Sequence, residues 1–110
     1  MQINQALFAA DLPVERKVTL VLDGGEVVEQ VVFVRPMTSL AWRQQVLTEE
    51  SADSGKVEMA LARMISAHIV DSDGTRLMSP EQAASLKPLV SAQMRDFIME
   101  VSGLGKPRAA

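Results

Sequence analysis

The residue most capable of chemistry in this sequence is its single histidine, His68. It lies among Leu61, Met64 and Ile65, near the expected end of a helix. A neutral imidazole can act as a general base, but no serine or aspartate stands at a spacing that would complete a catalytic triad. A histidine at the edge of the core, stabilised by the helix dipole, explains the position better. We therefore expect His68 to be structural.

Two other patterns resemble ligand-binding motifs but lack their defining residues. Asp71-x-Asp73-Gly74 is similar to the opening of a calcium-binding loop, yet the glycine comes two positions early and no glutamate closes the loop. Gly55-Lys56 and Gly105-Lys106 lack the upstream glycine and the following serine or threonine of a phosphate-binding loop. The chain has no cysteine, which excludes disulfides, a thiol nucleophile and thiolate zinc sites. We expect no enzymatic activity, no cofactor and no metal.

Composition limits the kinds of partner. The 110 residues are 47% apolar and 23% charged, which fits one globular domain spanning residues 1–110. The net charge is −3 and the basic residues are dispersed, so nucleic acid is not an expected partner. The first basic residue is Arg16, and no apolar run approaches the length of a membrane helix. We therefore expect no signal peptide, no membrane association and a cytoplasmic location.

Three parts of the chain differ in their pattern. Residues 1–16 form a leader arm that contains Pro13. Residues 17–36 predict a β-hairpin, because two runs rich in branched residues flank Asp23-Gly24-Gly25 and Pro36 ends the second run. The helical part, residues 37–102, is followed by a flexible tail, residues 103–110.

The helical part has recognisable starts and stops. Thr38 or Ser39 caps a helix that runs to about Glu50, and a second helix covers about 56–69. Ser79-Pro80-Glu81-Gln82 is a capping box at the start of a short third helix. A last helix ends at Ser102, with Gly103 as its cap. The expected fold class is α+β, with an N-terminal hairpin, a small antiparallel sheet, and three to four α-helices packed on it.

Several apolar positions fall outside the expected core faces. The last helix has one ordinary apolar stripe, made by Val90, Met94, Phe97, Ile98 and Val101. The helix that starts near Ser39 has two, because Leu40 and Leu47 point about 140° away from Trp42 and Val46. One of these pairs can lie on the sheet and the other needs a second layer or a partner. The hairpin is apolar on both sides, which predicts cover from both sides.

These positions define a candidate protein-binding surface. It consists of five apolar residues and two arginines that could meet acidic groups of a partner: Trp42, Val46, Met59, Leu89, Met99, Arg35 and Arg43. The seven methionines of the chain suit an adaptable contact surface. The alternative is that helices and leader cover these residues within the chain, and that the arginines make only intramolecular pairs.

Three short motifs resemble those of a known family. A hairpin leads into Arg35-Pro36-Met37-Thr38 and then Leu40-Ala41-Trp42-Arg43, and Gly103-Leu104-Gly105-Lys106 stands near the end. This arrangement, from Val18 to Pro107, resembles the tail assembly chaperones of long-tailed bacteriophages and prophages.

The resemblance implies a non-enzymatic chaperone of tail assembly. Such a protein binds the tape measure protein, recruits tail tube subunits, acts in the host bacterial cytoplasm and is absent from the mature virion. The resemblance also implies a longer form made by frameshifting, of which this chain would be the short form. The alternative function is a structural virion subunit, either a tail component or a head–tail connector. Weak homo-oligomerisation stays open.

Overall fold

The computed structural model of this chain describes residues 3–9, 12–21 and 24–104. The fold class is α+β, as predicted, with the strands of a hairpin first and four α-helices after them. In chain order the elements are η1 (Gln5–Leu7), β1 (Val14–Val21), β2 (Val27–Val34), α1 (Ser39–Glu49), α2 (Ser54–His68), β3 (Ile69–Val70), α3 (Pro80–Ala84) and α4 (Pro88–Val101). The sheet is antiparallel, with the order β1-β2-β3.

The hairpin forms where the sequence predicted it. Its register runs from Val14 opposite Val34 to Val21 opposite Val27. Gly24 and Gly25 both have positive φ, at 91° and 84°, a backbone conformation that favours glycine in a tight connection. β1 begins three residues before the predicted start, so the end of the expected leader belongs to the sheet.

The third strand was not predicted. β3 continues directly from α2 and has two residues, which pair with the end of β2 at Phe33 and Val34. A strand of two residues has no apolar period of its own, so pairing with β2 alone defines it. The helical part thus also contributes to the sheet.

Side-chain caps fix the starts of three helices. The Thr38 hydroxyl accepts the Ala41 N–H at 3.1 Å, as predicted for α1. Asp53 accepts the N–H groups of Gly55 and Lys56, which places the start of α2 two residues before the predicted one. The predicted capping box at the start of α3 is confirmed, with both of its reciprocal bonds present.

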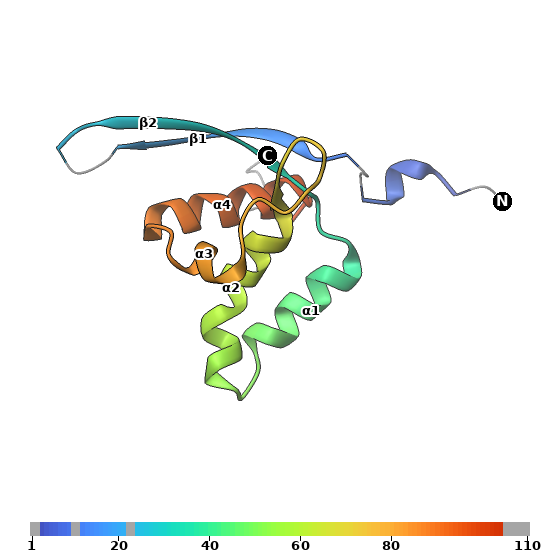
Figure 1. Cartoon of the computed structure of the whole chain (residues 1–110). Coiled ribbons are helices and arrows are strands. Elements are labelled where there is room, and N and C mark those ends of the chain that lie inside the picture. Colours follow the sequence, from blue (N-terminus) through green and yellow to red (C-terminus); the bar gives the residue numbers. More distant parts are fainter. Residues whose placement is uncertain (1–2, 10–11, 22–23, 105–110) are drawn as a thin grey trace, which may run out of the picture.

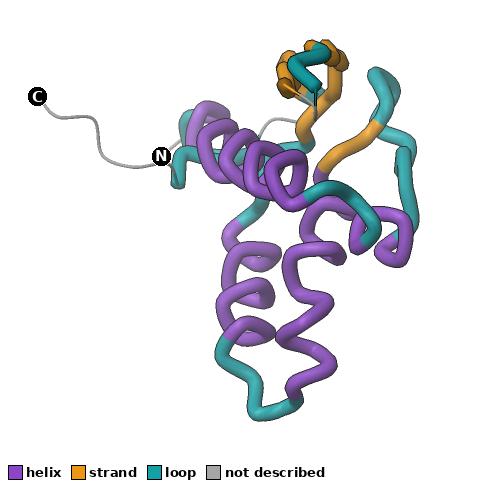
Figure 2. Tube along the Cα trace, turned by 90° about the vertical axis from the view of Figure 1, so that its left-hand side faces the viewer, coloured by secondary structure: helices purple, strands orange, loops and turns teal. Residues whose placement is uncertain are grey.

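The helices cover only one face of the sheet (Figure 1). α4 runs below the hairpin, whereas α1 and α2 extend away from it as an antiparallel pair (Figure 2). α1 packs mainly on α2 and not on the sheet, so the expectation that one of its apolar pairs lies on the sheet is wrong. The alternative that helices and leader cover both faces of the hairpin within the chain is wrong as well, because the described residues leave its outer face open. Val27 and Val31, on the outer face, are 57% and 43% exposed.

The core lies where β1, β2, α2 and α4 meet. Its fully enclosed members include Val34, Ile65, Ile69 and Ile98. The predicted stripe of α4 is confirmed, since Met94 and Ile98 are buried and its other three members pack against the core. Gly103, just past the end of α4, has a φ of +76°, as expected for a helix-ending glycine. Most of the predicted tail, 105–110, lies outside the described residues.

Candidate functional site

The outer face of α1 carries the most regular exposed apolar pattern. Leu40 and Leu47 are 64% and 56% exposed, and their spacing of seven residues places them on the same face of the helix. Arg43 is exposed and lies between them in the sequence. Trp42 and Val46, the pair chosen for the candidate surface, are half-buried, and Trp42 packs against the core. Leu40 and Leu47 are not part of the predicted surface, but they are the more accessible pair.

A buried amide fixes how α1 sits on α2. The Gln45 side chain donates to the Ala60 carbonyl at 3.3 Å and to the Glu49 carboxylate at 3.1 Å. This contact places Val46 and Met59, the respective chain neighbours of Gln45 and Ala60, at the same level of the two helices. Met59 is half-buried and packs against the core. The Gln45 contact thus fixes how α1 sits against α2 at the level of Val46 and Met59.

The predicted residues of α4 do not form one patch. Met99 is half-buried, whereas Leu89 is 71% exposed in the first turn of the helix. Ten residues separate them, which corresponds to about 15 Å along a helix axis. Leu89 therefore belongs to a different part of the surface from Met99.

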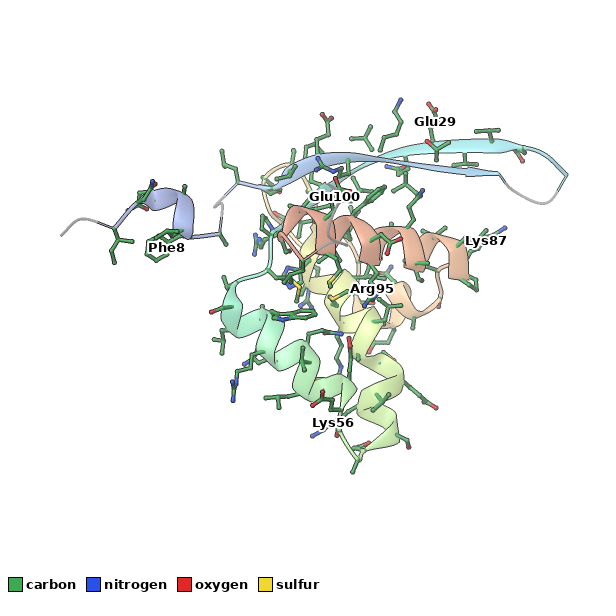
Figure 3. All side chains as sticks on the ribbon, turned by 180° about the vertical axis from the view of Figure 1, so that it is seen from behind. Phe8, Glu29, Lys56, Lys87, Arg95 and Glu100 are labelled. Atoms are coloured by element: carbon green, nitrogen blue, oxygen red, sulfur yellow. The ribbon has the colours of Figure 1, made fainter. Side chains whose placement is uncertain are left out.

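The two predicted arginines have different surroundings. The Arg35 side chain donates to the Gly74 carbonyl at 2.7 Å, and its backbone N–H donates to the His68 carbonyl. Arg35 thus joins the end of β2 to the turn after β3. In the described part of the chain the ion pairs are Arg16–Glu100 and Lys17–Glu29, so neither Arg35 nor Arg43 is neutralised by a carboxylate there. Figure 3 shows Glu100 on α4 below the hairpin.

Another apolar surface, which is not part of the surface predicted from the sequence, is the N-terminal arm, described over residues 3–9 and at Leu12. Its large side chains are all at least 59% exposed: Ile3, Leu7, Phe8 and Leu12. The arm leaves the body at the end of the sheet away from the hairpin turn (Figure 1), and Phe8 lies apart from the helices (Figure 3). The available signal was a run of apolar residues before Pro13 with no helical or strand period.

His68 lies at the edge of the core, at the end of α2. Its Nδ1 atom is 3.0 Å from the Arg35 carbonyl oxygen, to which the neutral ring donates. Burial lowers the pKa of the ring from its ordinary value, the main effect on this group. This geometry holds the junction between β2 and α2 together and agrees with the structural role expected from the sequence.

The described residues contain no cluster of three or more metal-ligating side chains. The same residues include no helix with the length and apolar character needed to span a bilayer. What the described surface does offer is apolar area on α1, on the arm and on the outer face of the hairpin.

Comparisons with known proteins identify a family. The sequence model of a family described as phage tail assembly chaperone, TAC, matches residues 2–102. No curated protein and no solved structure matches the chain.

Proposed function

Because this chain belongs to the phage tail assembly chaperone family, we propose that it binds the tape measure protein and tail tube subunits while a tail is built and leaves before the tail is complete. The proposed role needs no catalysis and is performed in the cytoplasm of the host bacterium. The observation that carries the proposal is the family match over 2–102.

The proposed client site is the outer face of α1, together with Trp42 and Val46, which are half-buried on another side of the same helix. Leu40 and Leu47 present an apolar strip with the spacing that recognises an amphipathic helix. Arg43 is exposed and offers a positive charge to an acidic group of the client. Trp42 and Val46 point about 140° away from Leu40 and Leu47, so they form a separate, half-buried part of the proposed surface. The strip is small and open to solvent, which suits an affinity low enough for release.

Solubility of a client fragment tests the proposal. Co-expression of the full chain with a tape measure fragment should keep that fragment soluble and yield a complex that co-purifies. Failure of the wild-type chain to bind the tape measure protein or the tail tube subunit would remove the proposed function.

Charge substitutions locate the site. Leu40→Asp combined with Leu47→Asp places two charges in the proposed contact and should weaken client binding by about 10- to 100-fold, which corresponds to roughly 1–3 kcal/mol. Leu77→Asp is the matched control, because Leu77 is also an exposed leucine (45%) but lies on the segment before α3. Equal binding by all three proteins would show that clients bind elsewhere.

Trp42→Ala and Met59→Asp test the half-buried part of the surface. Both residues pack against the core, so each variant requires a parallel measurement of its unfolding. Full client binding by folded variants would remove Trp42 and Met59 from the site. Client binding by Leu89→Asp and Met99→Asp tests in the same way whether the surface continues onto α4.

Mass spectrometry of purified particles separates the two functions considered. A chaperone that leaves before completion should be absent from the particles. A structural subunit should be present in stoichiometric amounts, and the bare outer face of the hairpin would then be its packing surface.

A further inference from the structure

The second edge of the hairpin is open along most of β2. β3 covers this edge only at Phe33 and Val34. The Arg35 N–H donates to the carbonyl of His68, the residue just before β3. By alternation the backbone groups of Val31, Glu29 and Val27 point to the same side of β2. The Val31 carbonyl, which points to this open side, accepts a hydrogen bond from the Gln30 side-chain amide at 3.1 Å. Among the described residues no strand pairs with this part of the edge.

A strongly apolar pocket lies below the same edge. It has a volume of about 360 Å³ and is lined by residues of β2, of the segment after β3 and of α4, among them Val28, Val32, Leu77, Met78, Val90 and Met94. The segment that supplies Leu77 and Met78 follows β3, which lies on the open side of β2. An added strand could therefore bond to the edge and place alternate side chains in the pocket.

The open edge of β2 and the N-terminal arm both carry no net charge, because Lys17 neutralises the one charge on the edge. The one charged side chain between Val27 and Val31 is Glu29, which pairs with Lys17 at 3.6 Å across the outer face. The arm carries no charge between Ile3 and Ala9. β1, the other edge strand, carries Glu15, Arg16 and Lys17 in succession, a pattern that discourages strand addition. The neutral edge of β2 thus suits the neutral arm.

The arm also has the right length and side-chain alternation. Seven extended residues span roughly 23 Å, more than the roughly 17 Å of the five-residue edge. In an extended conformation Ile3 and Leu7 would share one side and Phe8 would point to the other. The three-residue turn η1 buries none of its residues, so extending it costs little.

We propose that the arm of one copy of this chain adds as a strand to the open edge of β2 in a second copy. Ile3 and Leu7 enter the apolar pocket, and Phe8 covers the outer face beside Val27 and Val31. The arm and the hairpin turn lie at opposite ends of the sheet (Figure 1), so the contact is head-to-tail. A head-to-tail contact continues into rings or open chains of subunits.

Two complementary variants of the full chain test the contact. Leu7→Asp disables the arm and leaves the edge intact, whereas Leu77→Asp disables the pocket and leaves the arm intact. Both residues are exposed, at 78% and 45%, so the fold should tolerate either change. Molar mass is measured by light scattering or sedimentation over a range of concentrations, together with circular dichroism as a check of folding.

The expected results distinguish this contact from other modes of association. The wild-type chain should grow through dimers to larger species as its concentration rises, and each variant alone should remain a monomer. An equimolar mixture should give a heterodimer that grows no further, because one working arm meets one working edge. Asn4→Asp adds the same charge at an outward position of the arm, so this control should associate like the wild type.

Three outcomes would overturn the proposal. They are a wild-type chain that stays monomeric at high concentration, variants that associate as well as the wild type, and a mixture that forms no heterodimer. A monomer whose residues 6–8 are protected from exchange would indicate that the arm closes on its own body, where it borders a pocket of about 540 Å³. Client binding is measured separately on α1, so failure here leaves the proposed function standing.

Discussion

At the scale of single residues, His68 links protonation to stability. The ring is buried, donates to the Arg35 carbonyl and has a pKa below its ordinary value of 6.5 because burial disfavours its charged form. The unfolded chain therefore takes up a proton more readily than the folded chain.

The lowered pKa of His68 predicts how the free energy of unfolding depends on pH. The stability contributed by the neutral ring is fully present above pH 6.5 and is lost as the pH falls below it, because the unfolded state then binds more protons. Urea unfolding between about pH 8 and about pH 5.5 measures the effect. His68→Gln removes the titrating group, so its free energy of unfolding should fall less over this range. Equal slopes for the two proteins would contradict the assignment.

At the scale of elements, α4 holds the layers together. It contacts β1, β2 and α2, and its Ile98 is fully buried, whereas Leu89 on the same helix is 71% exposed. Ile98 and Leu89 have side chains of the same size and lie on the same helix, but only Ile98 is buried.

The comparison of these two residues gives a paired prediction. Ile98→Ala should lower the free energy of unfolding by about 2–5 kcal/mol, because it removes buried methyl groups and leaves a cavity. Leu89→Ala should change it by less than about 0.5 kcal/mol, as is usual at exposed positions. Chemical denaturation of both variants tests this, and similar losses for the two would mean that α4 is packed differently.

The elements also show how far the sequence determines the fold. The hairpin, the cap at Thr38 and the capping box at Ser79 follow from local rules of backbone geometry, so they could be predicted. β3 could not, because its pairing depends on where α2 directs the chain. The packing of α1 was unpredictable for a related reason. Its two apolar faces are equivalent in the sequence, and they are distinguished by contacts of the folded chain: Gln45 bonds to α2 and Trp42 packs against the core.

The candidate site was predictable only in part. The sequence identifies α1 as the helix with surplus apolar residues, but their exposure depends on which neighbour the helix meets. The sequence prediction also placed Leu89 and Met99 on one surface. The structure separates the two residues, and the spacing of residues along α4 does not reveal which neighbouring element covers each position.

At the scale of the whole molecule, stability should be uneven. The sheet, α2 and α4 share one core, whereas α1 packs mainly on α2 and has Gln45 as its one buried residue. A unit with so little buried apolar area opens at a lower free energy than the core.

Hydrogen exchange tests this difference. The amides of α1 should exchange before those of α2 around Ile65, under conditions where the chain is folded. Native-state exchange read by mass spectrometry or NMR resolves the two helices. Equal protection would mean that α1 opens together with the core, and that the proposed client site is as rigid as the rest of the protein.

The single tryptophan has a practical consequence. Trp42 is half-buried on α1 and touches the core, so its emission wavelength reports on the environment of that helix alone. Separation of α1 from the core would shift the emission to the red while the far-ultraviolet signal of the other helices persists. The chain thus carries its own fluorophore at the helix that we propose receives the client.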